Sequence, residues 1–152
     1  MRRAALLFLV GLSPFLLGWL LSRAMMTIFA EMGGAWLYLV LGLAMLMLWA
    51  VAAGMLGFKG SKGRMALTVL CLNLPAAAVL VLLGVQELAL HAYWTNAAGL
   101  WTQMFYLPVL RLGAILGGWT GQLFWAYFAA FLLLVLVSWM GCRARQEPGE
   151  NA

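Results

Sequence analysis

The side chains best suited to chemistry lie in one stretch, residues 86–111, between two long apolar runs. This stretch holds Glu87 and His91, the latter being the chain's single histidine. On a helix a spacing of four residues places both side chains on one face. There a carboxylate and an imidazole can share a proton or contribute ligands to a metal ion. The pair is therefore the first candidate for a functional site.

Two side chains are too few for the common catalytic and metal centres. A metal site takes three or four protein ligands, and a catalytic triad of the Ser-His-Asp kind needs an aspartate, which the chain lacks. A single histidine also excludes a haem held by two. Cys71 and Cys142 form no CxxC motif, and one lies inside a span while the other follows one, so neither dithiol chemistry nor an intrachain disulfide is expected. We predict no enzyme activity, no metal and no cofactor.

Four apolar runs frame this stretch and set the fold class. They cover residues 4–22, 35–58, 65–85 and 120–140, each about 20 residues, enough for a helix to cross the ~30 Å hydrocarbon core of a bilayer. The whole chain is 66% hydrophobic and 9% charged, whereas soluble domains are about 25% charged. We predict an all-α membrane protein whose residues 1–145 form a single domain in the lipid bilayer. The polar tail 146–152 is predicted to be disordered.

The basic residues are grouped next to the ends of these runs, and their distribution predicts the topology. No cleavage site for a signal peptidase follows the first run, so this run is predicted to be the first span. The positive-inside rule then places both termini in the cytoplasm and the protein in the cell membrane. The net charge of +5 is explained by these groups, and no nucleic-acid partner is expected. The residues predicted to be cytoplasmic are Arg2, Arg3, Lys59, Lys62, Arg64, Arg143 and Arg145, against Arg23 and Arg111 outside.

Residues 86–111 show a helical pattern of their own. Trp94 and Trp101 lie seven residues apart on an apolar side, and Glu87 and His91 lie on a polar side. The pattern predicts an amphipathic helix in the outer membrane interface that joins the third and fourth spans and ends before Pro108. The predicted architecture is therefore two hairpins of spans with an interfacial helix in the second.

Two prolines, Pro14 and Pro75, fall near the middle of the first and third spans. A proline removes a backbone hydrogen bond, and matching breaks in two hairpins are typical of internal repeats that line a transport path. If such a path exists, its predicted polar lining is Ser13, Asn73, Glu87 and Gln122, with His91 near its mouth.

Small residues recur before and at the start of the last span. Gly113, Gly117 and Gly121 are four residues apart, a spacing that allows close approach of a second helix. The partner is either another helix of this chain or a second copy. This pattern, together with the small size of the bundle, favours a homo-oligomer or a complex with a partner membrane protein.

These patterns lead to three functional hypotheses. The leading one is a non-enzymatic structural or accessory subunit of a membrane assembly. The alternative is a small oligomeric channel or transporter, and the third is a membrane-embedded enzyme.

The topology can be tested with single cysteines in a variant that lacks Cys71 and Cys142. Cysteines that replace Ser61 and Asn151 should be protected from an impermeant thiol reagent in intact cells, because both lie in predicted cytoplasmic segments. A cysteine at Thr95 should be labelled, because it follows the third span on the outer side. Labelling at Asn151 in intact cells would contradict four spans with both termini inside.

Overall fold

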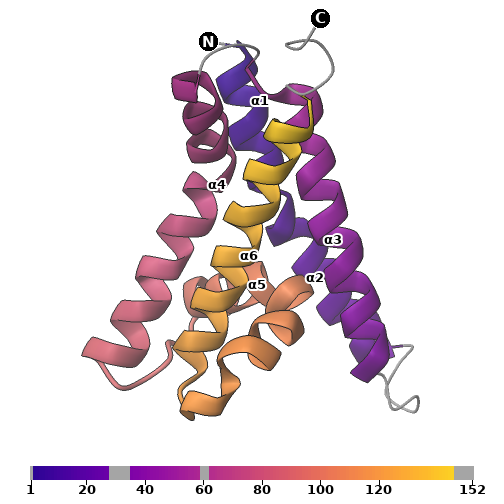
Figure 1. The fold of residues 1–152 in the computed structure, drawn as a ribbon. Helices are drawn as coiled ribbons and strands as arrows, with labels where there is room; N and C mark the ends of the chain where they lie inside the picture. Colours follow the sequence, from indigo (N-terminus) through magenta and orange to yellow (C-terminus); the bar gives the residue numbers. More distant parts are fainter. Residues whose placement is uncertain (1, 28–34, 59–61, 146–152) are drawn as a thin grey trace, which may run out of the picture.

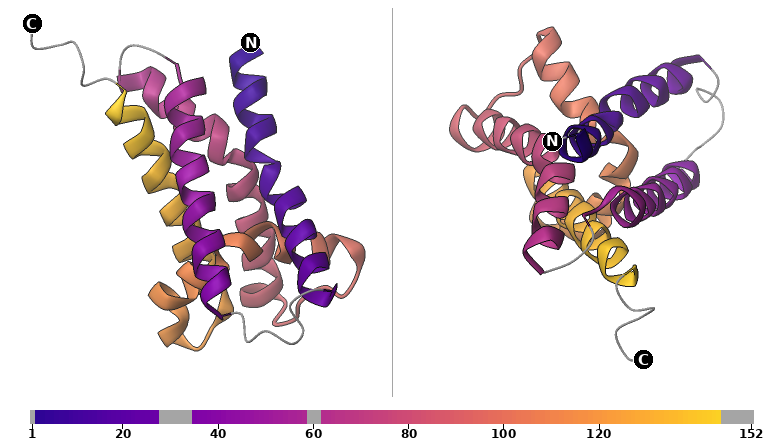
Figure 2. Two further views of the ribbon diagram at one scale, coloured as in Figure 1. Left: turned by 90° about the vertical axis from the view of Figure 1, so that its right-hand side faces the viewer. Right: turned by 90° about the horizontal axis from the view of Figure 1, so that it is seen from above.

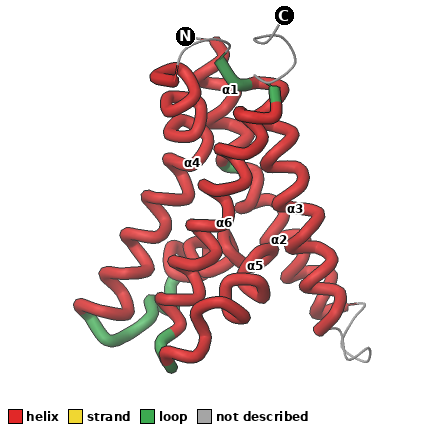
Figure 3. The backbone as a smooth tube through the Cα atoms, viewed as in Figure 1, coloured by secondary structure: helices red, strands yellow, loops and turns green. Residues whose placement is uncertain are grey.

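The structure, a computed structural model, describes residues 2–27, 35–58 and 62–145. Within these ranges the chain forms helices joined by short turns, and no strand is present (Figure 3). The all-α prediction is confirmed for this part of the chain. In order, the elements are α1 (Arg2–Gly11), α2 (Ser13–Thr27), α3 (Ala35–Leu56), α4 (Lys62–Gly84), the π-helix η1 (Val85–Ala89), α5 (Ala97–Gly117), the 3-10 helix η2 (Gly118–Thr120) and α6 (Leu123–Ala144).

Four helical segments are long and apolar enough to cross a membrane, as predicted. They agree with the apolar runs of the sequence to within a few residues. The first combines α1 and α2, and the third combines α4 with η1. Their bounds are Arg3–Ala24, Tyr38–Leu56, Gly63–Ala89 and Leu123–Ala144. The predicted tail 146–152 lies outside the described residues.

The spans run alternately up and down, so that four helix termini meet at one end of the bundle. These are the start of α1, the end of α3, the start of α4 and the end of α6 (Figure 1, top). We call this the basic end, because Arg3, Arg64, Arg143 and Arg145 lie in these terminal turns. Four spans bring Arg2 and Arg145, the two ends of the described chain, to the same side. That this side faces the cytoplasm stays a prediction.

Side chains close the basic end by binding backbone groups that helix termini leave without partners. The guanidinium of Arg145 donates to the carbonyl oxygens of Met55, at 2.6 Å, and of Gly54, in the last turn of α3. The Thr68 hydroxyl accepts a hydrogen bond from the Phe58 backbone N–H at 2.9 Å. These contacts attach the end of α3 to α6 and α4.

The first span bends where its two helices meet at Leu12. Pro14 has no N–H to continue the helical ladder, and the chain passes the break through bonds from Leu12 N to the carbonyls of Phe8 and Leu9, both 3.1 Å. α1 then packs on α4, whereas α2 packs on α5 (Figure 2). The contact with α4 is close: a Cβ atom on Gly11 would lie 2.4 Å from the Leu72 carbonyl oxygen.

The predicted grouping into two hairpins is not confirmed. The first span makes its main contacts with α4 and α5, and α3 makes its main contacts with α6 and α5. The first two spans therefore pack less on each other than on helices farther along the chain, whereas the third and fourth spans do contact each other through α4 and α6. The reason is α5, which lies against α2, α3 and α6 in the half of the bundle opposite the basic end.

α5 also differs from the interfacial helix predicted for residues 86–111. It begins only at Ala97, where the Asn96 side chain accepts a bond from Gly99 N at 2.9 Å. It continues through Pro108 to Gly117, so the predicted end before this proline is wrong. Pro108 deprives the Met104 carbonyl of its helical partner, and the Gly18 backbone of α2 packs directly on that carbonyl. Eight residues of α5 are buried among other helices, and its interfacial position is not confirmed.

The glycines at the end of α5 face α6 of the same chain. A Cβ atom on Gly113 would lie 2.1 Å from the Ala126 carbonyl oxygen, and one on Gly117 would lie 2.5 Å from that of Trp125. Gly121 does not continue this face, contrary to the predicted spacing pattern. It lies in the turn before α6 with a φ of 75°, a left-handed conformation that suits glycine.

Aromatic side chains connect α5 to the spans around it. The rings of Phe15 (α2) and Phe105 (α5) lie 4.8 Å apart between centroids, and Phe105 and Tyr106 lie 5.1 Å apart. Tyr106 then contacts Tyr127 (α6) at 5.7 Å. The buried Tyr106 hydroxyl donates to the Ala76 carbonyl of α4 at 2.7 Å. A single helix thus contributes to the core contacts of three spans.

Replacing Gly113 by alanine should destabilise the fold by about 1–3 kcal/mol, because the added methyl group overlaps the backbone of α6. The measurement is unfolding in mixed micelles titrated with a denaturing detergent. The matched control is Gly63→Ala in the first turn of α4, where a Cβ atom meets nothing within 4 Å and stability should not fall. Equal stability of Gly113→Ala and the parent would contradict this packing.

Candidate functional site

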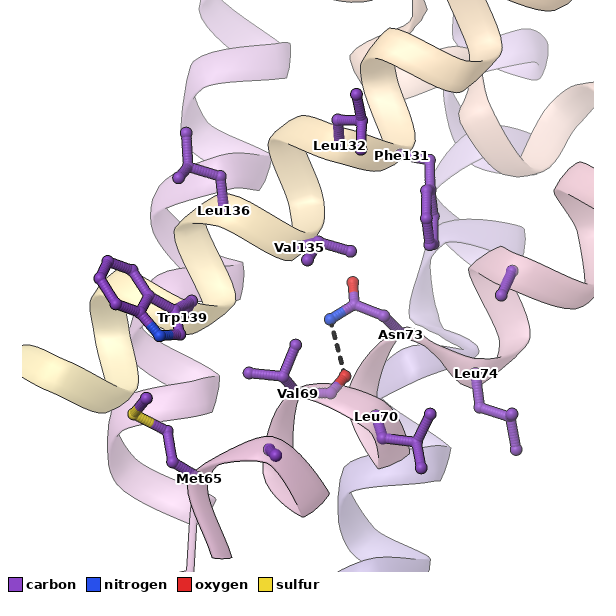
Figure 4. A pocket seen from close by; sticks show the side chains of 12 residues that line it. Met65, Val69, Leu70, Asn73, Leu74, Phe131, Leu132, Val135, Leu136 and Trp139 are labelled. Atoms are coloured by element: carbon purple, nitrogen blue, oxygen red, sulfur yellow. Dashed lines mark hydrogen bonds between the residues drawn. The ribbon is translucent and has the colours of Figure 1, made fainter. Parts of the chain in front are cut away.

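A buried polar network lies between three of the spans and is centred on Asn73 of α4. Its side-chain oxygen accepts a hydrogen bond from Trp49 Nε1 of α3 at 3.1 Å. Its Nδ2 atom donates to Ser138 Oγ of α6 and to the Val69 carbonyl of its own helix, both at 2.9 Å. Figure 4 shows the carboxamide of Asn73 directed toward α6 and its bond to Val69. Ser138 in turn donates to the Leu134 carbonyl at 2.6 Å.

The network leaves Asn73 with little capacity to bind anything else. A carboxamide has two N–H donors, and both already have acceptors in the chain. Hydrogen bonds between membrane helices contribute about 0.6 kcal/mol each on average, so the two bonds to α3 and α6 give a modest but directed stabilisation. Asn73, predicted as a polar side chain of a transport path, is positioned as a connector of helices.

An elongated groove lies beside this network, between α4 and α6. Its volume is about 820 Å³ and its lining is almost wholly apolar. Asn73 contributes the polar atoms at its base, with one wall from each helix (Figure 4). We call it the α4–α6 groove. Its main lining residues are Met65, Val69, Leu70, Asn73 and Ala77 of α4, and Phe131, Leu132, Val135, Leu136 and Trp139 of α6.

A second buried network lies at the opposite end of the bundle and is centred on Gln86. This side chain is fully buried in the π-helix that extends α4. Its Oε1 atom accepts from Trp94 N at 3.0 Å, and its Nε2 atom donates to Thr102 Oγ1 at 3.3 Å. Gln86 therefore holds the turn between the third span and the start of α5 in place.

The structure does not pair Glu87 with His91. The helix ends at Ala89, and His91 lies in the following turn, exposed and with a φ of 49°. Glu87 is half-buried and accepts a hydrogen bond from the Tyr93 hydroxyl. Burial, the hydrogen bond to Glu87 and the negative charge of Glu87 all raise the pKa of Tyr93. Tyr93 therefore remains a protonated donor to this carboxylate at physiological pH.

The four side chains predicted to line a path lie in separate places. Ser13 is half-buried at the start of α2, and Asn73 is engaged in the central network. Glu87 contacts Tyr93, and the exposed Gln122 accepts from Trp125 Nε1 at 3.0 Å. All four are in the described ranges, and no hydrogen bond joins any two of them. Whether any of them has a functional role stays a prediction.

Sequence reasoning missed several residues that the structure makes central. Trp49 and Ser138 complete the Asn73 network, and Tyr106 and Gln86 anchor α5 and its preceding turn. One usable signal was the depth of Trp49, since tryptophans of membrane spans prefer the interfaces. A polar residue deep in a span, as Ser138 is, is a similar signal, because it needs a partner inside the protein.

Comparison with known proteins does not assign a function to these residues. No protein-family model, curated protein or solved structure matches the chain. Within residues 2–27, 35–58 and 62–145, no group of three or more His, Cys, Asp or Glu side chains is placed to hold a metal ion.

Replacing Asn73 by leucine should lower the free energy of unfolding by about 1–3 kcal/mol, because it leaves the buried Trp49 N–H without an acceptor. Denaturing-detergent titration measures the loss, and Gln103→Leu, which removes an amide that bonds no other helix, is the control. The double variant with Trp49→Phe should lose less than the sum of the single changes, because both remove the same bond. Strict additivity would mean that this bond does not contribute.

Proposed function

We propose that the protein is a non-enzymatic accessory subunit of a membrane assembly, acting through its lipid-facing surface on a partner membrane protein or on a second copy. The proposal rests on one observation, which is that the buried polar side chains are already hydrogen-bonded within the protein. Among the described residues, no buried side-chain nitrogen or oxygen lacks a hydrogen-bond partner within the chain.

Such an interior is suited to holding helices together rather than to conducting or converting a substrate. A pore needs polar groups that replace the water of a passing ion, and a catalytic site needs titratable groups placed together. Here Asn73 and Gln86 are engaged with other helices, and the core between them is filled by Phe105, Tyr106 and Tyr127. What remains for interaction is the outer surface.

That surface presents large apolar side chains along the spans, as lipid or a partner helix requires. Met47 of α3 is 71% exposed and Val81 of α4 is 65% exposed. Without a hydrophobic driving force between helices in lipid, association depends on packing and on specific contacts. The proposal places the partner on this surface and assigns the buried networks the task of keeping it rigid.

Flux through purified protein in liposomes separates the accessory role from the channel alternative. We expect no cation flux above that of empty liposomes at low ionic strength, where screening of Glu87 is weakest. Glu87→Gln should then change nothing, and an ionophore serves as the positive control. Cation flux in the parent that falls in Glu87→Gln would replace the accessory role with a channel, because a carboxylate at a mouth concentrates cations.

The partner itself can be sought in the native membrane with a photoreactive amino acid at one site at a time. Met47 and Val81 are the exposed test positions, and the fully buried Leu72 is the matched control. The accessory role predicts a discrete protein adduct from at least one exposed position and none from Leu72. Adducts with lipid alone at every exposed position would contradict it.

A further inference from the structure

The α4–α6 groove is about one leaflet deep and begins at the basic end. On α4 it runs from Met65 to Ala77, twelve residues apart, which is about 18 Å at the helical rise. Half of a bilayer core is about 15 Å. Figure 4 shows Met65 and Trp139 facing each other at one end of the groove. These residues belong to the first turn of α4 and the last turns of α6.

This depth favours an acyl chain over a helix as the occupant. A partner helix that crosses the membrane would pack along the full ~30 Å of the core, whereas a lipid chain occupies one leaflet. The volume of about 820 Å³ lies within the ~300–1,000 Å³ typical of small-molecule sites. The polar atoms of Asn73 at the base are already bonded within the chain, so the groove suits an apolar occupant.

The charge at the mouth of the groove is complementary to a phosphate. Arg64 directly precedes Met65 and is exposed. The guanidinium of Arg143 lies 5.3 Å from the centre of the Trp139 ring, which lines the same end. The positive N-terminus of α4, at Lys62, is at this end too. Glu87, the one carboxylate among the described residues, follows the far end of α4.

We propose that the α4–α6 groove binds one anionic phospholipid, with an acyl chain along α4 and α6 and the phosphate beside Arg64 and Arg143. The occupant is a lipid of the leaflet that borders the basic end. The site goes beyond the accessory role and does not depend on it, because it needs no partner protein.

Native mass spectrometry of the purified full-length protein in mild detergent tests the site. The probes are phosphatidylglycerol and phosphatidylcholine with identical acyl chains, added at equal concentrations. We expect one retained phosphatidylglycerol and little phosphatidylcholine. Arg64→Gln and Arg143→Gln should each weaken phosphatidylglycerol retention about fivefold, since a basic residue at the membrane surface contributes about 1 kcal/mol to anionic lipid binding.

Two further variants separate this site from general lipid contact. Arg3→Gln removes an exposed charge of the same end in α1, outside the groove, and should leave retention unchanged. Ala77→Trp fills the inner end of the groove and should abolish retention of both lipids, whereas Ala78→Trp, at an exposed alanine of α4 outside the groove lining, should not. If Ala77→Trp fails to fold, a photoreactive acyl chain on phosphatidylglycerol gives the same answer in the parent, by labelling residues 65–77 and 131–139.

Equal retention of the two lipids, an equal loss in Arg3→Gln and Arg64→Gln, or photolabelling spread evenly over the four spans would each overturn the proposal. A dimer that fills the groove and excludes lipid would also overturn it, by making a second copy the occupant. None of these results bears on the accessory role, which the flux and crosslinking measurements address.

Discussion

The need to pair every polar group inside a lipid-facing bundle governs this structure. Lipid offers no hydrogen bonds, so a polar side chain in a span either finds a partner within the protein or costs several kcal/mol. Asn73 satisfies this need through α3 and α6 at once, and Gln86 does so through the turn before α5 and through α5 itself. Each network therefore works as a positional restraint, because the bonds form only when the helices adopt one arrangement.

The position of α5 follows from the same need together with close packing. The Tyr106 hydroxyl reaches the Ala76 carbonyl only if α5 lies inside the bundle. The glycines at the contacts, Gly18 of α2 and Gly113 of α5, permit the backbones to approach. With the aromatic rings of Phe105 and Tyr106 filling the space, the half opposite the basic end has a dense core. Packed side chains thus fill the interior, so we expect partners and lipids to bind at the outer surface and in the α4–α6 groove.

The proposed roles use different parts of that surface. A partner helix packs over the whole depth of the membrane on exposed positions such as Met47 and Val81, whereas a lipid chain needs only the half-depth groove that begins beneath Arg64 and Arg143. A lipid at the mouth of the groove would contact the first turn of α4 and the last turns of α6. The neighbouring Thr68, in the second turn of α4, and Arg145, at the end of α6, bind backbone groups at the end of α3.

The sequence by itself determined the class of the protein and its four spans, because runs of about twenty apolar residues are stable in a bilayer only as helices. It did not determine which face of each helix points inward. In α3 the buried Trp49 and the exposed Met47 are both apolar, so no periodicity separates core from lipid.

In residues 86–111, too, the sequence predicted helix and the tertiary structure decided where that helix lies. Their helical periodicity predicted one interfacial helix, but the chain turns between Ala89 and Ala97 and then enters the bundle. Gln86 gains its partners, Trp94 N and Thr102, only because of that turn, and Tyr106 gains the Ala76 carbonyl only from α4. These partners are up to 30 residues apart in the chain. Tertiary structure therefore decided which of these groups form hydrogen bonds with each other. A hydrogen bond depends on the positions of both groups in space, and the local periodicity of the sequence does not predict those positions.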